Sequence, residues 1–307
     1  MSSSLPTSSH WQKRYPDVYI STGKTKILLA HQPVIRLGAF AGVFAGVFAA
    51  MVLWELLAPW RRQAIGRLSR WPSNLGIVVL DTLLVQPVFP LAAVGVALLA
   101  EIRGWGLFQT LEAPVWLAIV ASVVLLDLAI YLQHVLFHAV PMLWRLHRMH
   151  HTDLEFDVTT GVRFHPFEIL LSMAIKLGVV AALGMPAVAV LIFEVLLNAT
   201  SMFNHGNVRL PRRFDRILRW IVVTPDMHRV HHSLVCCETN SNFGFNLPWW
   251  DRLFGTYRAE PLAGDEGMII GIEQFRDPVE LRLDRMVLQP FRGDDRSYPL
   301  GRREPTA

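Results

Sequence analysis

Eight of the twelve histidines in this 307-residue chain stand in three short clusters. His134 and His138 are four residues apart, and positions three or four apart on a helix project from one side. The other two clusters share the pattern His-x2-His-His: His147, His150, His151 and His228, His231, His232. Neutral imidazole is a common metal ligand, and eight imidazoles suit two metal ions better than one. The sequence therefore predicts a two-metal site.

Helix capping, haem ligation and zinc proteolysis fit the histidine pattern less well. Histidines that cap helices or lie at a membrane surface have no need of repeated triplets. Haem requires only an axial pair per group, so the adjacent His150 and His151 would serve no purpose. The string His-Glu-x-x-His of a membrane zinc protease does not occur in the sequence.

Two further histidines are candidates for the same site. His205 shares one helical face with Glu194, Asn198 and Ser201, at offsets of 4, 7 and 11 residues, so polar groups line an otherwise apolar helix. We expect His205 to be a ninth ligand, and Glu194 and Asn198 to be ligands or to support ligands. His165 can be a ligand, a donor that orients a ligand, or a helix cap.

Buried carboxylates near the clusters are expected to orient imidazole rings. Asp127 lies on the same helical face as His134 and His138, one or two turns away, and can accept a ring N–H. The alternative is an ion pair between Asp127 and an arginine elsewhere in the bundle. Glu168 and Asp226 are weaker candidates for the same role.

The elements that position these residues are apolar. The chain is 52% hydrophobic and only 18% charged, which indicates a membrane protein. Long apolar blocks are expected at 37–54, 75–100, 114–140 and 169–202. Pro87 and Pro90 interrupt the second block, while Gly184 and Pro186 divide the fourth into a hairpin. The predicted fold is an all-α, multi-pass membrane helix bundle.

Four segments follow from this pattern. They are a polar N-terminal segment (1–36), N-terminal transmembrane helices (37–113), a catalytic domain (114–257) and a soluble C-terminal tail (258–307). The arginine-rich loop 61–73 is expected on the cytoplasmic side, which places the histidine clusters on the same face. The basic N-terminal segment favours the opposite orientation. Usage of 25 arginines against four lysines suggests a bacterial source, and hence the inner membrane.

The three motifs HVLFH (134–138), LHRMHH (146–151) and HRVHH (228–232) resemble the integral-membrane fatty acid hydroxylase/sterol desaturase superfamily. The strings RFHPFE, FNHGNV and NFGFNLPWWDRLFGTY support the resemblance, which covers roughly residues 114–257. It implies a non-haem di-iron centre that uses O2 and two electrons to attack an unactivated C–H bond of a sterol, fatty acyl or alkyl lipid. The eight clustered histidines would be ligands. Ser201 stands where some family hydroxylases have a further histidine.

The resemblance also implies a lipid substrate and a separate electron donor. Phe137, Trp144, Phe164 and Phe203 are expected to line a substrate channel, although core packing accounts for each of them equally well. The sequence shows no dinucleotide-binding turn and no iron–sulfur cysteine set, so a reductase, ferredoxin, cytochrome or pterin is implied. Alkylglycerol monooxygenase, in the same superfamily, uses a pterin. We expect no nucleic-acid partner. Hydroxylation and desaturation both remain open, as does a non-redox zinc-binding or metal-handling protein.

Overall fold

The computed structural model describes residues 42–293 and residue 300. Almost all of them belong to one compact unit, Gly46–Ala307, and the chain's other unit, Met1–Ala45, is described only at 42–45. The predicted polar segment 1–36 lies outside the described residues. Within the described part the chain is helical and forms no named strand, although Pro59 bridges Val208 and Ser233 bridges Ile270. This confirms the all-α prediction.

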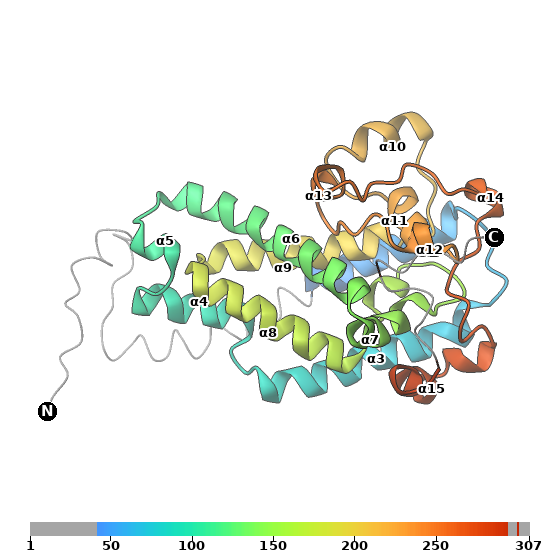
Figure 1. Ribbon diagram of the computed structural model, residues 1–307, viewed down its shortest axis with the longest axis horizontal. Coiled ribbons are helices and arrows are strands. Elements are labelled where there is room, and N and C mark those ends of the chain that lie inside the picture. The colour runs from blue at the N-terminus through green and yellow to red at the C-terminus, as the bar shows by residue number, and fades with distance from the viewer. Residues whose placement is uncertain (1–41, 294–299, 301–307) are drawn as a thin grey trace, which may run out of the picture. The chain divides into compact units, whose positions relative to one another are not determined.

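The long helices are apolar enough to cross a membrane. The four candidate spans of the described residues are Arg67–Thr110, Val115–Ala139, Pro166–Leu183 and Ala187–Asn204. The first contains α3 (Arg67–Val88), α4 (Ala92–Arg103) and α5 (Leu107–Thr110), and the others are α6, α8 and α9. A shorter apolar helix precedes them at Gly42–Leu57. Figure 1 shows α6, α8 and α9 running alongside one another. The structure thus confirms a multi-pass helix bundle.

Helix breaks fall where the sequence contains proline and glycine. α3 ends at Val88 and α4 begins at Ala92, as the two prolines predicted. The α8–α9 hairpin turns at Gly184, which has a φ of 61°. A Cβ at Gly184 would lie 2.1 Å from the carbonyl oxygen of Trp105, so this turn also needs glycine for close packing.

One helix boundary differs from the sequence expectation. The arginine-rich segment 61–73 was expected to be a loop, but α3 already begins at Arg67 and contains Arg70. Arg70 is fully buried and donates to both oxygens of Asp153 at 3.0 and 2.9 Å, and it also pairs with Asp157. These two buried carboxylates draw the basic side chain into the protein, so the helix extends past it.

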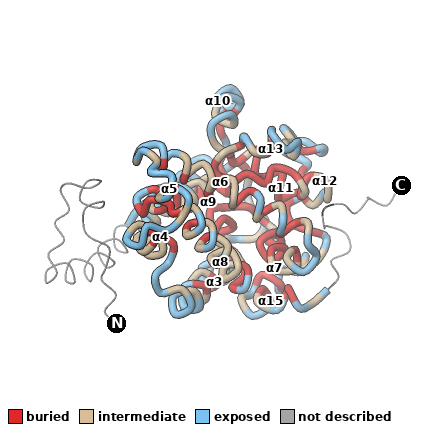
Figure 2. Tube along the Cα trace, turned by 60° about the vertical axis from the view of Figure 1, so that its left-hand side comes forward, coloured by how far each residue is buried: buried red, intermediate tan, exposed pale blue. Residues whose placement is uncertain are grey.

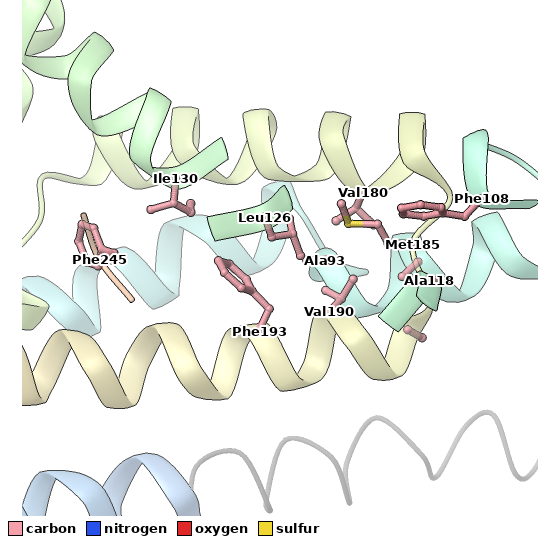
Figure 3. Packing of buried hydrophobic residues seen from close by; sticks show 12 residues of the cluster. Ala93, Phe108, Ala118, Leu126, Ile130, Val180, Met185, Val190, Phe193 and Phe245 are labelled. Atoms are coloured by element: carbon pink, nitrogen blue, oxygen red, sulfur yellow. The ribbon is translucent and has the colours of Figure 1, made fainter. Parts of the chain in front are cut away.

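Apolar packing between α4, α6, α8 and α9 forms the main core. Leu126 of α6 packs in one cluster with Val180 of α8 and Phe193 of α9, and Ile130 of α6 lies toward Phe245, as Figure 3 shows. Phe245 closes the end of this cluster that is nearest the histidines. The long helices are therefore held in fixed register beneath the predicted metal site.

Short helices gather at one end of the long ones (Figure 1). They are α7 (Pro141–His151), α10 (Arg212–Leu218), α11 (Pro225–His231), α12 (Cys236–Thr239), α13 (Trp249–Leu253), α14 (Gly264–Gly267) and α15 (Leu283–Leu288), with 3-10 turns at Thr160–Val162, Pro278–Leu281 and Gln289–Phe291. Burial is dense around α7 and α11 (Figure 2). These are the helices that carry the two His-x2-His-His motifs.

Candidate metal centre

Nine histidines from four helices meet at this end of the bundle. His134 and His138 lie in the last turns of α6, and α7 ends with its three histidines. α11 carries the third cluster, with His232 at its C-cap, and His205 is the C-cap of α9. Each of the nine residues is at most 4% exposed.

Local sequence fixes where these helices begin. α7 starts with Pro141 at its first position, where the absence of an N–H costs nothing. α11 has Pro225 at the same position, and the Thr224 hydroxyl accepts the N–H of Met227 as an N-cap. Each short helix therefore begins in a defined register and presents its histidines on one side.

The nine imidazoles form two groups. One contains His134, His138, His147, His151 and His231, and the other contains His150, His205, His228 and His232. Within each group, one nitrogen per ring lies within 4.8 Å of the corresponding nitrogens of the others. The two groups are adjacent, since the rings of His150 and His147 are 5.3 Å apart. Two metal ions fit this division.

In most rings Nδ1 points away from the group centre and binds an acceptor. His134 Nδ1 lies 2.7 Å from the Phe243 carbonyl oxygen, and His231 Nδ1 lies 2.7 Å from that of Ser241. His150 and His205 make the same contact to the carbonyls of Arg163 and Ser201, at 3.1 and 2.7 Å. A carbonyl oxygen can only accept a hydrogen bond, so these Nδ1 atoms carry the ring protons. In each neutral ring, Nε2 is then a bare lone pair.

The lone pairs face one another across very short distances. His134 Nε2 and His147 Nε2 are 3.1 Å apart, and His205 Nε2 is 3.1 Å from His150 Nε2. His147 Nδ1 lies 2.6 Å from Glu168 Oε1, and a ring proton held there leaves Nε2 of His147 as a lone pair that faces the lone pair of His134. Among the described residues, Nε2 of His138, His231 and His232 has no hydrogen-bond partner. Lone pairs that converge in this way suit cations, and the donor set therefore fits two metal ions.

Burial keeps the imidazoles neutral, which is the form that binds metal. Burial lowers the pKa of both His147 and His205 from 6.5 to about 3. It also lowers the pKa of His150 and His232 well below 6.5, and neighbouring imidazoles reinforce the shift. Protons therefore compete weakly for these nitrogens at neutral pH.

Glu168 is the one carboxylate that contacts a ring of the groups. Its Oε1 lies 2.6 Å from His147 Nδ1, and its side chain is 5% exposed. The first residues of α8 bring it there, because Pro166 begins the helix and His165 caps it. A carboxylate on Nδ1 fixes the tautomer and makes Nε2 more basic.

A loop after α12 supplies several ring acceptors, and Asp251 holds it in place. The Asp251 carboxylate accepts the N–H groups of Phe243 and Gly244 at 2.8 and 2.9 Å, as well as the Thr256 hydroxyl at 2.7 Å. Asn240, earlier in the same loop, places its Oδ1 3.2 Å from His138 Nδ1. The segment 240–251 thus orients rings of the five-histidine group.

A buried polar network holds the connection between α7 and α8. Arg163 donates to the Met149 carbonyl at 3.0 Å, to Asn74 at 3.2 Å and to Thr152. Asp153 accepts from Arg70 and from Thr160. Arg70 holds the pKa of Asp157 below its usual value despite burial, which alone would raise it. Because the Arg163 carbonyl binds His150, this network fixes that ring as well.

Asp127 and Asp226, named from the sequence, bind other partners. Asp127 accepts from the backbone of Asn246 and Leu247 and from Trp250 Nε1, so it anchors a loop instead of a histidine. Asp226 pairs with Arg229 at 2.6 Å.

The remaining polar candidates also make contacts outside the two groups. Glu194 pairs with Lys176 at 2.8 Å, and Asn198 donates to the Glu194 carbonyl. His165 accepts the N–H of Phe167 as the N-cap of α8, which is the helix-cap alternative.

The four expected channel residues occupy different places. Phe164 stacks on His150, with ring centres 4.4 Å apart, and Trp144 lies 4.8 Å from His138. Phe137 is buried 6.0 Å from the His147 ring. Phe203 instead packs on Trp54, 6.2 Å away.

The backbone acceptors of the rings were not foreseen from the sequence. A carbonyl oxygen has no residue signature, so the motif spacing could not indicate it. The sequence feature that pointed to this part of the site was the segment NFGFNLPWWD. It contains Phe243 and also Asp251, whose carboxylate accepts the N–H of Phe243.

Fold and site together define a helical membrane protein with two buried groups of imidazoles, each of which could hold a metal ion. Residues 119–256, a little under half of the chain, match the family model described as fatty acid hydroxylase. The match contains all nine histidines.

Three curated proteins illustrate the similarity. Ornithine lipid hydroxylase OlsE of Rhizobium tropici is 32% identical over 148 residues, which is 48% of this chain and 44% of that protein. Alkylglycerol monooxygenase of Xenopus tropicalis is 25% identical over 205 residues (63% and 43%), and cholesterol 25-hydroxylase of Rattus norvegicus is 27% identical over 164 residues (51% and 53%). The chain thus spans about half the length of the curated relatives it matches. No solved structure matches the chain.

Proposed function

We propose that this protein is a membrane-bound, O2-dependent lipid hydroxylase whose nine clustered histidines hold two iron ions. The observation that carries the proposal is the convergence of unprotonated Nε2 atoms into two adjacent groups. The relatives support the lipid substrate, because their names describe hydroxylases or monooxygenases of an ornithine lipid, an alkylglycerol and cholesterol.

The metal pair would supply redox chemistry, in which a C–H bond, O2, two electrons and two protons give an alcohol and water. The protein's own residues prepare the site for it. Backbone carbonyls, the Asn240 side chain and Glu168 lie at Nδ1 of six of the nine rings and would hold their Nε2 atoms toward the metals. Imidazole ligands resist oxidation, unlike the thiolates of cysteine.

Aromatic side chains exclude water from the centre. Phe164 covers His150, Phe243 packs against His134 and His138, and Phe156 lies 5.1 Å from His232. Phe137, Trp144 and Phe164 are proposed to border the path of the reacting chain, and Phe203 its outer part. The low dielectric that results favours attack on a C–H bond over side reactions with water.

Electrons must come from a separate donor. A reductase, ferredoxin, cytochrome or pterin is proposed, and the alkylglycerol monooxygenase relatives keep the pterin option open. The catalytic domain is proposed to be 114–257, with its histidine groups on the cytoplasmic side of a bacterial inner membrane. Desaturation would use the same centre.

The deciding experiment measures O2 consumption by iron-reconstituted, chemically reduced protein with a membrane lipid extract. We expect about two irons per chain and lipid products heavier by one oxygen from 18O2. His150→Ala and His231→Ala, one in each group, should abolish this turnover. Tight binding of zinc without any O2 uptake by the iron form would support a non-redox metal protein instead.

A further inference from the structure

Two short segments far apart in the chain form one exposed apolar platform at the side of the bundle. We define it as α10 with the residues up to 221, together with α13 and Phe254. Its large exposed side chains are Phe214, Ile217, Trp220, Ile221, Leu253 and Phe254. Ile217 is 67% exposed and Leu253 is 69% exposed. Apolar residues gathered in this way on a folded surface mark an interaction site.

The platform is built rigidly. Trp249 Nε1 donates to the Trp220 carbonyl at 2.8 Å, which ties α13 to the end of α10. The Arg252 guanidinium lies 3.7 Å from the Trp220 ring centre and also donates to the Arg219 carbonyl. Trp220 is therefore held at the surface by specific contacts, although 58% of it is exposed.

Two contacts with α6 fix the position of the platform along the axis of that helix. Trp250 Nε1 donates to Asp127 at 2.8 Å, and Phe254 stacks on Tyr131 with ring centres 5.5 Å apart. Tyr131 is eight residues before the end of α6 at Ala139, or about 12 Å along the helix. Asp127 is about 18 Å from that end by the same rise per residue.

These positions fall within the thickness of a membrane. The 25 residues of α6 are about 37 Å long, some 7 Å more than a hydrocarbon core of about 30 Å. Even if all of the surplus emerges at the histidine end, Tyr131 lies about 5 Å below the hydrocarbon boundary. α13 and Phe254 pack on this level of α6, where an outward-facing surface would meet lipid and not the aqueous phase.

We propose that the platform inserts into the leaflet on the histidine side of the membrane, with its apolar side chains among the upper acyl chains. The charged residues of the platform also agree with insertion into a lipid leaflet. Arg212, Arg213 and Arg216 are exposed on α10, where long side chains can reach anionic headgroups. Exposed tryptophan beside arginine is typical of a membrane–water interface.

Labelled cysteines in vesicles test the insertion. In a Cys236→Ser, Cys237→Ser background, Ile217→Cys, Leu253→Cys and Glu266→Cys each carry a fluorescent label that senses polarity. Glu266 is an exposed control on α14, which does not belong to the platform although its Asp265 pairs with Arg212 of α10 at 3.9 Å. The protein is reconstituted in phosphatidylethanolamine–phosphatidylglycerol vesicles, with or without lipids that bear a doxyl group at carbon 5 of the chain.

We expect the doxyl lipid to lower emission roughly twofold or more at positions 217 and 253, because interfacial helices reach about 5–10 Å into the bilayer. Aqueous iodide should quench only the label at 266. Iodide quenching at 217 and 253 without doxyl quenching would overturn the proposal. Protection from both quenchers would also overturn it, since a second copy of the chain or another protein would then cover the platform. Monodispersity of each labelled variant shows that it remains folded.

Discussion

Glu168 and His147 are joined by a 2.6 Å contact on the side of the imidazole opposite the nitrogen that faces His134. α8 supplies the carboxylate and α7 the ring, so one contact links a membrane-spanning helix to the metal site. In the other group, His150 and His205 have neutral carbonyl acceptors on Nδ1. Among the described residues, the carboxyl group behind His147 therefore distinguishes the five-histidine group from the four-histidine group.

The first prediction concerns this carboxylate. Glu168→Gln keeps the size of the side chain but removes its charge, so it should weaken metal binding at the five-histidine group by about 10- to 100-fold. Metal titration with a chelator competitor measures the loss. The four-histidine group should retain its affinity, and equal loss at both sites would show that Glu168 acts only through general stability.

The sequence was sufficient to predict the residues that approach one another. Spacings of three and four residues placed His147, His150 and His151 on one side of a helix, and proline and glycine marked the helix breaks. These are properties of single helices, and they hold whatever the helix packs against.

The partners of those residues depended on tertiary structure. Asp127 shares a helical face with His134, yet it binds the loop at Asn246 and Leu247 because that loop offers unpaired N–H groups. Arg70 is buried on one face of α3 because Asp153, more than 80 residues away, lies beside it. Spacing within one segment carries no information about such distant contacts.

The second prediction separates two histidines that the sequence alone left less certain than the other eight. His205→Ala removes a member of the four-histidine group, so the iron content should fall from about two to about one per chain and turnover should be lost. His165→Ala removes a helix cap and a 3.2 Å contact with the Val287 carbonyl, and should cost about 1–2 kcal/mol of stability without loss of iron. Iron analysis and thermal unfolding measure both effects. An unchanged iron content in His205→Ala would contradict its assignment as a ligand.

The third prediction concerns the buried ion pairs behind α7. Arg70→Met leaves Asp157 buried without its cation and leaves Asp153 with only Arg163 at 3.9 Å, so it should lower the free energy of unfolding by about 3–5 kcal/mol. Unfolding in detergent by circular dichroism measures this. Arg282→Met breaks an exposed pair with Asp284 and should change stability by less than about 1 kcal/mol. Similar small effects of both variants would show that the buried network does not stabilise the fold.

The fourth prediction is a pH dependence of the metal-free protein. Burial holds the pKa of His147 and His205 near 3, whereas it is near 6.5 in an unfolded chain. Between these values the unfolded state binds more protons, so stability should fall as the pH drops below 6.5. The free energy of unfolding should then fall by up to about 1.4 kcal/mol per pH unit for each of these two histidines. Melting temperatures from pH 8 to pH 5 test this. His205→Gln removes one of these two titrating groups, so the stability of this variant should depend less steeply on pH. A melting temperature that does not change with pH in the parent protein would contradict the prediction.

The last prediction tests whether the fold positions His205 through a residue that is not itself a ligand. Gly161 lies so close to α9 that a Cβ there would be 2.6 Å from the Ser201 carbonyl oxygen and 3.0 Å from His205 Nδ1. These two atoms form the hydrogen bond that orients the ring, so Gly161→Ala must displace it. We expect weaker metal binding at the four-histidine group, by about tenfold, with the other group unaffected. Gly178→Ala on α8, where a Cβ meets nothing within 4 Å, is the matched control and should bind metal normally. If Gly161→Ala also bound two metals with parental affinity, the hydrogen bond between Ser201 and His205 would not be what aligns this ligand.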